Sequence, residues 1–455
     1  MSKLKSGLIA LFITLFVLNS FLHLAFLPTV MAVLAGLVFC FSVRELKPLN
    51  RKMIILLLIG SGFFIWSGPS NFNWGHAVIE NAGIVTLLLT APMLGIILYY
   101  APYETVLLSF ANRYIRTNYV FYLMTLCLVA FLCVLMNLAT IPFTYQLLAP
   151  IAAKYPPVIL QRALTRGFIL NLFWAPNLIC VAVVLKYVHI SWQELAGVGL
   201  AFSVLAFIGA CAVGKYDNPP DESCPKGQSA AEQSQVLDGK SESRGYLFSL
   251  FVQVVLILLA LVTLIHYVGK SIYVILAIIA LGIPLLFAFA LGKTGIYRQK
   301  LIHYFCSTLP GMSNEFMLFI SIGFFGYALA QSPAIIFVQS QLAVLNNFSP
   351  SVLVVIIIAT ITGLSMAGIH PIITISSLAI TLGKVDIGLS SVQLAISLLA
   401  GYIMYMLLSP FSSMVMILSG LFKQNVYEMG LRLNGRYALV LALLVAFAIH
   451  VWRQI

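Results

Sequence analysis

Long apolar runs separated by short polar segments fill most of the chain. A helix that crosses a membrane needs about 20 mainly apolar residues, and the pattern predicts about eleven full spans of that kind. The expected spans are residues 7–25, 28–43, 53–67, 80–100, 168–187, 196–214, 246–268, 271–292, 312–332, 391–422 and 436–453. The chain is therefore expected to be an all-α polytopic membrane protein surrounded by the lipid bilayer.

Two further apolar segments, 119–153 and 349–383, do not fit this pattern. Each is too long for one span, and too short and too interrupted for two. We interpret each as a re-entrant hairpin, with its tip near 138–142 in the first and near 366–371 in the second. Non-helical backbone at membrane depth is tolerated only where protein or a water-filled cavity covers it. The tips are therefore expected to line a cavity.

Pro and small polar residues also interrupt two of the apolar segments. Pro176 lies inside the first expected broken helix, 165–187, and Pro410 lies inside the second, 391–422. A plain membrane helix would have no such residues at these depths. Paired interruptions in the two halves of a membrane protein point to a substrate site built from broken helices.

The positions of the Lys and Arg residues indicate how these segments are oriented. Cytoplasmic loops of membrane proteins carry an excess of both residue types. Nearly all of them fall on one side if the amino terminus is cytoplasmic and both hairpins return to the side they enter, whereas loops 68–79 and 188–195 contain none. The cytoplasmic residues would be Lys3, Lys5, Arg44, Lys47, Arg51, Lys52, Arg113, Arg116, Lys154, Arg162, Arg166, Lys293, Arg298, Lys300, Lys423, Arg432 and Arg436. This predicts a multi-pass protein of the plasma membrane with an external carboxy terminus.

The same orientation divides the chain into two inverted repeats. Residues 1–27 would form an extra first helix, repeat 1 would span 28–214, and repeat 2 would span 246–455. The repeats are inverted because the first hairpin enters from inside and the second from outside. The polar segment 215–245 has the composition of a flexible cytoplasmic linker, with a regulatory tail as the alternative.

Two intermediate segments, 101–118 and 333–348, follow the third helix of each repeat. The first carries Arg113 and Arg116 among apolar side chains, a pattern typical of an amphipathic helix along the membrane surface. Such a helix could carry the neighbouring hairpin, or it could be a simple connector.

Composition agrees with this class and excludes others. The chain has 455 residues, of which 61% are hydrophobic and 8% charged, whereas a soluble domain carries roughly 25% charged residues. The net charge of +12 is explained by basic loops, so no nucleic-acid partner is expected. The His residues are dispersed without acidic partners, and no Gly-rich nucleotide-binding motif occurs. We therefore expect no enzyme activity and no cofactor besides a coupling ion, with no resident metal.

Small polar residues at the tips and breaks are the candidate ligands for a substrate or ion. Helix amino ends at such breaks attract anions and helix carboxyl ends attract cations, so few charged side chains are needed. The alternative is that Ser and Thr bond to their own helix or pack neighbouring helices. The candidates are Asn137, Thr140, Thr144, Asn171 and Asn177 in repeat 1, and Thr362, Ser365, His370, Thr374, Ser409, Ser412 and Ser413 in repeat 2.

Three ionisable residues are candidates for proton or cation coupling. His370 is the one His at an expected hairpin tip and could donate to an anion or take up a proton, or it could be a neutral residue bonded to backbone. Glu80 and Glu315 lie at the start of matching helices. An intramembrane carboxylate is a functional hypothesis by default, although both could instead sit at the interface as capping residues.

At these motifs the chain resembles the ion transporter superfamily, which includes the divalent-anion/sodium symporters and the arsenite permeases. In the symporters a Ser-Asn-Thr signature marks each tip and a Thr-Pro-Pro-Asn-like signature marks each break. The matching segments here are Ala175-Pro176-Asn177-Leu178-Ile179 and Ser409-Pro410-Phe411-Ser412 at the breaks, and Thr140-Ile141-Pro142 and Gly368-Ile369-His370 at the tips. Neither tip reads Ser-Asn-Thr, so the resemblance is to a divergent member.

The resemblance implies an elevator-type secondary transporter, usually a homodimer, in which hairpins and broken helices slide against a scaffold. The expected function is transport of a small, anionic solute coupled to Na⁺ or H⁺. A cation/proton antiporter is one alternative, since Glu80 or Glu315 could serve it. A transport-inactive membrane sensor or assembly factor is another, because the tip signatures are lost.

Overall fold

The computed structural model describes residues 2–68, 71–103, 115, 117–217, 240–336, 348–383, 385 and 387–454. Within these ranges the regular structure is helical throughout, without a strand. Ten helical runs are long and apolar enough to cross a membrane. The predicted all-α multi-pass class is therefore confirmed.

The first half begins with helices close to the expected spans. They are α1 (Ser2–Leu22), α2 (Leu27–Ser42), α3 (Pro48–Trp66), α4 (Trp74–Ile79), α5 (Ala82–Thr90) and its 3₁₀ extension η2 (Ala91–Tyr99). The remaining elements are α7 (Asn118–Met136), η3 (Asn137–Ala139), α8 (Thr140–Ala152), α9 (Pro157–Ile169), η4 (Leu170–Phe173), α10 (Ile179–Val188) and α11 (Trp192–Asp217).

The second half of the chain is also helical. It contains α12 (Lys240–Val268), α13 (Ile272–Ala290), α14 (Thr294–His303), the π-helical turn η5 (Tyr304–Thr308), α15 (Leu309–Gly311) and α16 (Ser313–Gln331). It continues with α18 (Pro350–Met366), α19 (Pro371–Leu382), α20 (Ser391–Leu408), α21 (Ser413–Phe422), the π-helical turn η7 (Glu428–Arg432) and α22 (Leu433–Gln454).

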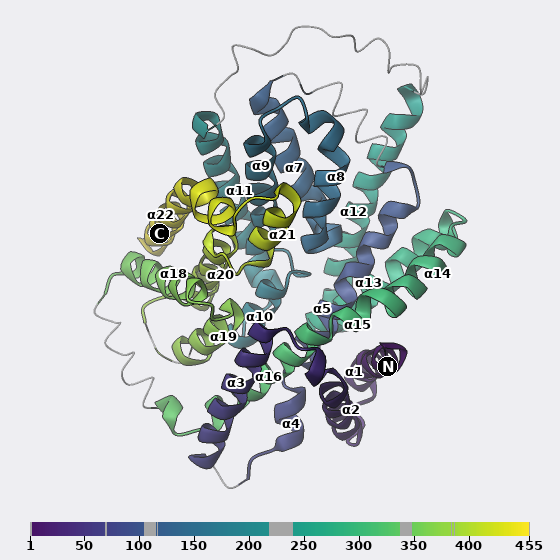
Figure 1. Cartoon of the computed structure of the whole chain (residues 1–455). Coiled ribbons are helices and arrows are strands. Elements are labelled where there is room, and N and C mark those ends of the chain that lie inside the picture. The colour runs from purple at the N-terminus through teal and green to yellow at the C-terminus, as the bar shows by residue number, and fades with distance from the viewer. Residues whose placement is uncertain are drawn as a thin grey trace.

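The helices form two groups in space. We name α1 to α5, η2 and α12 to α16 the frame unit, and α7 to α11 with α18 to α22 the core unit, because most extensive helix contacts lie within one group or the other. In Figure 1 most of the frame unit lies in the lower part of the view, with α12 rising on the right, and the core unit lies in the upper and left parts. The two units meet mainly where η2 contacts α7, α5 contacts α10, and α16 contacts α19.

Each half of the chain packs on the other half inside both units. In the core unit α10 contacts α19, and α8 contacts α21. In the frame unit α3 packs on α16, while α13 packs on α5 and η2. Helices of the first half therefore pack against helices of the second half in both units.

Some boundaries differ from the expectations. Helix α11 continues to Asp217 and α12 begins at Lys240, so both ends of the expected linker 215–245 are helical. The helix extends because the Asp217 carboxylate is held in a buried ion pair, described below. Helix α14 was not expected, since Thr294–His303 has no apolar face.

Several expected features lie outside the described residues. These are most of the surface segments 101–118 and 333–348, with Arg113 and Arg116, and the middle of the linker, 218–239.

Candidate substrate site

The tip between α7 and α8 contains two buried hydroxyl groups without a partner. Helix α7 ends at Met136, and Asn137 turns the chain with a φ of 52°, a backbone conformation that is uncommon for a residue with a side chain. Thr140 and Thr144 follow one helical turn apart in α8, and both are fully buried. Neither hydroxyl oxygen has a hydrogen-bond partner among the described residues. A buried hydroxyl in this condition costs about 1–3 kcal/mol, so a ligand that bonds it would recover that energy.

The tip between α18 and α19 repeats this feature. Gly368 has a φ of 94°, which favours glycine, and Pro371 starts α19. Ser365 is fully buried and Thr374 is 6% exposed. Their hydroxyl oxygens also lack a hydrogen-bond partner within the described part of the chain. Thr362 differs, because its hydroxyl donates to the carbonyl of Ile358 in its own helix at 2.7 Å.

His370 has a structural partner at this tip. Its Nδ1 atom accepts a hydrogen bond from the backbone N–H of Ile372 at 3.3 Å, which caps the amino end of α19. Its ring lies edge-on to Phe319 of α16, with the ring centroids 6.4 Å apart. His370 therefore joins the core unit to the frame unit, and Nδ1 must be deprotonated to accept its bond.

The break between η4 and α10 is fastened to α7 by two amide side chains. Asn171 Nδ2 donates to the carbonyl of Ala130 at 2.9 Å, and Asn177 Nδ2 donates to the carbonyl of Val134 at 3.1 Å. Their amide nitrogens are therefore engaged in holding the break beside the first tip. Among the described residues no side chain caps the amino end of α10, so its first N–H groups have no side-chain acceptor there.

The break between α20 and α21 is held by serine side chains. Ser409 Oγ donates to the carbonyl of Ser365 at 3.0 Å, which joins this break to the second tip. Ser412 Oγ accepts from the backbone N–H of Val415 at 3.1 Å and caps α21. Ser413 is exposed.

The tips and breaks are nearly free of charged side chains. Residues 130–144, 171–180, 362–375 and 405–414 contain no acidic or basic side chain other than His370. Because α10 contacts both α19 and α20 while α8 contacts α21, these segments belong to one packed assembly. A charged solute here would be recognised by helix ends and hydroxyl groups.

A second polar group lies where the two units meet. Lys186 of α10 forms an ion pair with Glu80 at 2.9 Å and donates to Asn81 Oδ1 at 2.8 Å. The Tyr187 hydroxyl donates to the same oxygen at 2.9 Å, and Asn81 Nδ2 donates to the carbonyl of Phe319 at 3.1 Å. We name Glu80, Asn81, Lys186 and Tyr187 the boundary cluster. It joins α10 of the core unit to the frame unit.

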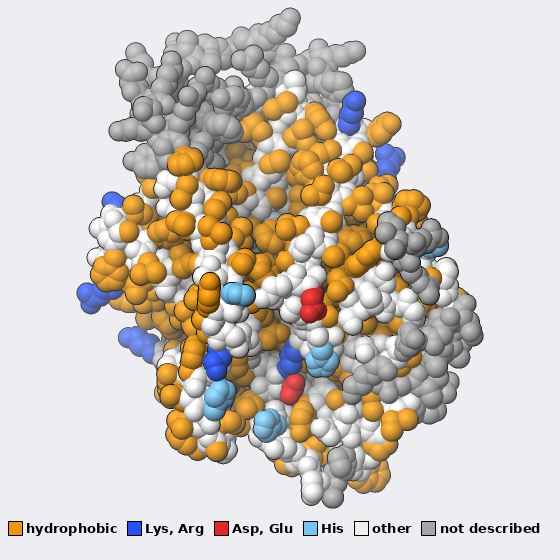
Figure 2. Space-filling model, turned by 180° about the vertical axis from the view of Figure 1, so that it is seen from behind, with side chains coloured by type: hydrophobic (Ala, Val, Ile, Leu, Met, Phe, Trp, Pro, Cys, Tyr) orange, Lys and Arg blue, Asp and Glu red, His pale blue; other side chains and the backbone are white. Residues whose placement is uncertain are grey.

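An open cavity of about 670 Å³ adjoins the boundary cluster. Glu80 and Lys186 line it together with His189, Lys270 and Tyr273. Figure 2 shows a face of the molecule that is mainly hydrophobic, with acidic and His side chains gathered in the lower half of the view.

Glu315 differs from Glu80 in that its described surroundings leave one carboxyl oxygen without a hydrogen bond. It lies in the first turn of α16 and is half-buried. Its Oε2 atom is buried and has no hydrogen-bond partner among the residues described. Within the same ranges, no group of three or more His, Cys, Asp and Glu side chains could hold a metal ion.

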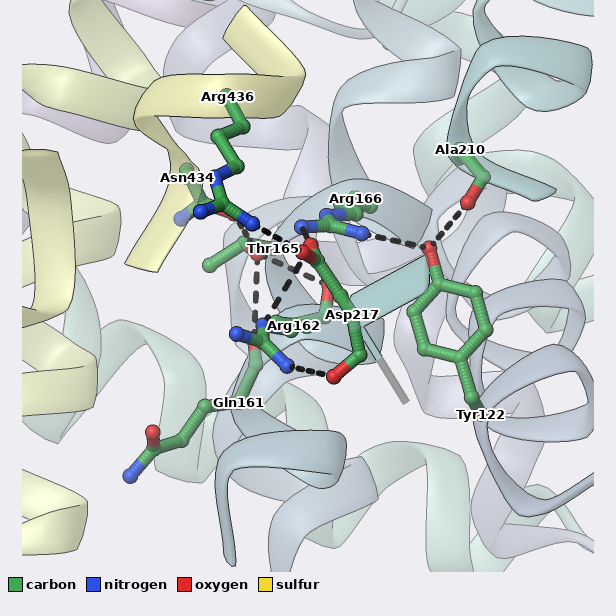
Figure 3. Close-up of polar contacts among 9 residues, drawn as sticks. All are labelled: Tyr122, Gln161, Arg162, Thr165, Arg166, Ala210, Asp217, Asn434 and Arg436. Carbon is green, nitrogen blue, oxygen red and sulfur yellow. Dashed lines mark hydrogen bonds and ion pairs between the residues drawn. The ribbon is translucent and has the colours of Figure 1, made fainter. Parts of the chain in front are cut away.

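Two groups of polar residues were missed at the sequence level. Lys186 lies inside an apolar span, which is itself a signal, but its partner Asn81 is distant in the chain. The second group surrounds Asp217 at the end of α11 and includes Arg162 and Arg166, four residues apart in α9 (Figure 3). That spacing places both on one helix face, although they were interpreted only as loop charges.

Comparison with known proteins relates the chain to a transporter by fold. No family model and no curated protein matches the sequence. Among solved structures, the YdaH transporter of Alcanivorax borkumensis, reported to have an unusual topology, matches with a TM-score of 0.60 and 14% sequence identity. The match covers 89% of this chain and 98% of that one. The chain is thus a multi-pass membrane protein with the fold of a membrane transporter.

Proposed function

We propose that this protein is a secondary active transporter whose solute binds between the two tips and the two breaks. The observation that carries the proposal is a set of four buried hydroxyl groups, two at each tip, that have no hydrogen-bond partner among the described residues: Thr140, Thr144, Ser365 and Thr374. Such groups are costly in a permanently empty protein interior. They are useful where a solute enters and leaves, and the YdaH-like fold supports that interpretation.

The proposed solute is a small anion. The uncapped amino end of α10 offers N–H groups and positive partial charge, and no Asp or Glu in the tips or breaks would repel a negative group. The carboxyl ends of α7, α18 and α20 offer carbonyl oxygens that suit a coupling Na⁺ ion. Coupling to H⁺ is the other form of the same proposal.

The proposed mechanism is a movement of the core unit against the frame unit. Both tips and both breaks belong to the core unit, so they would move together with a bound solute. The limited contacts between the units support this division. In this proposal the protein is a divergent member of the ion transporter superfamily, a homodimer in the plasma membrane with its amino terminus cytoplasmic and its carboxy terminus outside.

Reconstitution into proteoliposomes tests the proposal directly. Uptake of labelled dicarboxylates, amino acid conjugates and inorganic oxyanions would be measured with and without a Na⁺ or pH gradient. We expect gradient-driven uptake of an anion that falls at least tenfold in Thr140→Val and Thr374→Val. Thr362→Val is the matched control, because that hydroxyl already bonds its own helix. Wild-type activity in both tip variants, or a pure protein without uptake of any anion, would contradict the proposal.

A second candidate function is cation/proton antiport, which the unpaired buried carboxyl oxygen of Glu315 favours. A carboxyl group in this environment can exchange a proton for a cation. Na⁺-driven proton movement, recorded with a pH-sensitive dye inside the vesicles, would be abolished in Glu315→Gln. Unchanged proton movement in that variant would reject cation/proton antiport and would not affect the proposal of anion transport.

A further inference from the structure

A cluster of arginines surrounds one carboxylate at the end of α11, away from the tips and breaks. The Asp217 side chain is 6% exposed, and its Oδ2 atom lies 2.6 Å from Nη2 of the fully buried Arg166. Arg162 Nε lies 3.7 Å from the same oxygen, and Arg436 Nη1 lies 3.9 Å from Oδ1. Three guanidinium groups therefore share a single carboxylate (Figure 3).

Arg166, the innermost of the three arginines, is held in place by its neighbours. Its Nη1 donates to the hydroxyl of Tyr122 at 3.4 Å, and that hydroxyl donates to the carbonyl of Ala210 at 2.9 Å. The guanidinium also lies over the ring of Tyr437, 5.0 Å from the centroid. Arg166 and Asp217 thus form a fixed structural pair, whereas Arg436, 3.9 Å from Oδ1, makes only a long contact with the same carboxylate.

The outer arginines line an open cavity of about 600 Å³ between α9, η7 and α22. Arg436 is 88% exposed, and Arg432, paired with Glu428 at 3.7 Å, is 84% exposed. The six charged residues of this region are Arg162, Arg166, Arg432, Arg436, Asp217 and Glu428, which leaves four positive and two negative charges. The region therefore carries a net charge of +2 in the described part of the chain.

The side chains that line this cavity suit a ligand that carries a phosphate group. Guanidinium groups bind phosphate oxygens in a planar, bidentate manner. Gln161 Nε2 donates to Gln424 Oε1 at 3.1 Å across the same cavity, so amide groups are also at hand for hydroxyl or ester oxygens. The π-helical turn η7 places Arg432 in the lining of the cavity. Such turns occur frequently at functional sites.

We propose that this cavity binds a phosphate-bearing anion, held by Arg432 and Arg436 with Arg162 behind them. The phosphate can belong to the headgroup of an anionic phospholipid or to free phosphate. A basic pocket between membrane helices is typical of lipid headgroup recognition. The site is independent of the proposed solute site, because it shares no residue with the tips or breaks.

The test uses the purified, delipidated full chain in neutral detergent. Thermal unfolding is followed as a function of dihexanoyl phosphatidylglycerol, of a short-chain diacylglycerol without phosphate, and of inorganic phosphate at constant ionic strength. A ligand that binds the folded state raises the unfolding temperature in a saturable way. We expect this response to phosphatidylglycerol and none to the diacylglycerol. An equal response to inorganic phosphate identifies free phosphate as sufficient, whereas its absence identifies the lipid.

The double variant Arg432→Gln/Arg436→Gln should weaken this binding about tenfold or more, because it removes two charged donors. Both side chains are exposed, so the variant is expected to fold; Arg436→Gln alone gives the same comparison if it does not. Arg298→Gln, an exposed arginine on α14, is the matched control and should bind as the wild type does. A wild type without a saturable response to either phosphate source, or a double variant that binds with unchanged affinity, would overturn the proposal.

Discussion

The boundary cluster offers the sharpest test of movement between the two units. We consider Lys186→Met, which removes the charge but retains most of the apolar volume. In the wild type the Lys186 Nζ atom lies 2.9 Å from Glu80 and 2.8 Å from Asn81 Oδ1, with the two charged side chains 19% and 29% exposed. The change leaves a partly buried Glu80 without its counter-charge.

The magnitude follows from that degree of burial. Exposed ion pairs contribute about 0.2–1 kcal/mol, and breaking a buried pair costs about 3–5 kcal/mol. A pair that is about one-quarter exposed falls between these limits, at about 2 kcal/mol. If this energy is present only while the units are in the observed arrangement, its loss shifts the equilibrium between arrangements about 30-fold.

Single-molecule energy transfer between a dye on α2 of the frame unit and one on α11 of the core unit measures that shift. The population of the observed arrangement should fall in Lys186→Met and partly recover in Lys186→Met/Glu80→Gln, because the second change removes the unpaired charge. Lys270→Met is the matched control, since Lys270 lines the same cavity but pairs with His23 of the frame unit at 3.2 Å. An unchanged population in Lys186→Met, or additive effects in the double variant, would refute the reasoning.

The remaining predictions concern three other positions. His370→Asn should transport with the wild-type pH profile, because Asn can also cap α19; a displaced profile would show that the imidazole takes up a proton. Gly199→Ala should destabilise the protein by about 1–3 kcal/mol, because the added Cβ would lie 2.4 Å from the carbonyl oxygen at the end of η4. Gly197→Ala is the control, since its Cβ would meet nothing within 4 Å. Equal melting temperatures of the two variants would contradict this prediction. Arg166→Met should lower stability by about 3 kcal/mol because it removes the closest partner of the buried Asp217 carboxylate and leaves the more distant Arg162 and Arg436; a melting temperature within a degree of the wild type would reject it.

The positions of the membrane helices could be predicted because the bilayer imposes one length on every span. The expected spans 271–292 and 312–332 correspond to α13 (Ile272–Ala290) and α16 (Ser313–Gln331). Hydropathy carries this information locally, so no knowledge of neighbours was needed. Helix α14 was missed because it lacks an apolar face, and such a helix leaves no periodic signal.

The polar partners could not be predicted, because they are distant in sequence. Asn81 lies 105 residues from Lys186, and Arg166 lies 51 residues from Asp217. Local patterns indicate that a residue is polar within an apolar run, but they do not indicate what it meets. The four tip hydroxyls differ, because the sequence alone marked these residues as candidate ligands. Only the structure shows that they have no hydrogen-bond partner among the described residues. Their role as ligands stays a prediction.

The packing of the first half of the chain on the second half has a consequence for how the protein is made. Helix α8 packs on α21, and α10 packs on α19. A chain synthesised from its amino terminus therefore holds the first tip and the first break in the membrane before their partners exist. Although domains generally fold as they emerge, the first half of this chain stays incompletely packed until most of the second half has been inserted. Premature termination after the linker would then leave a membrane-inserted fragment with unmatched surfaces, suited to recognition by quality-control proteases.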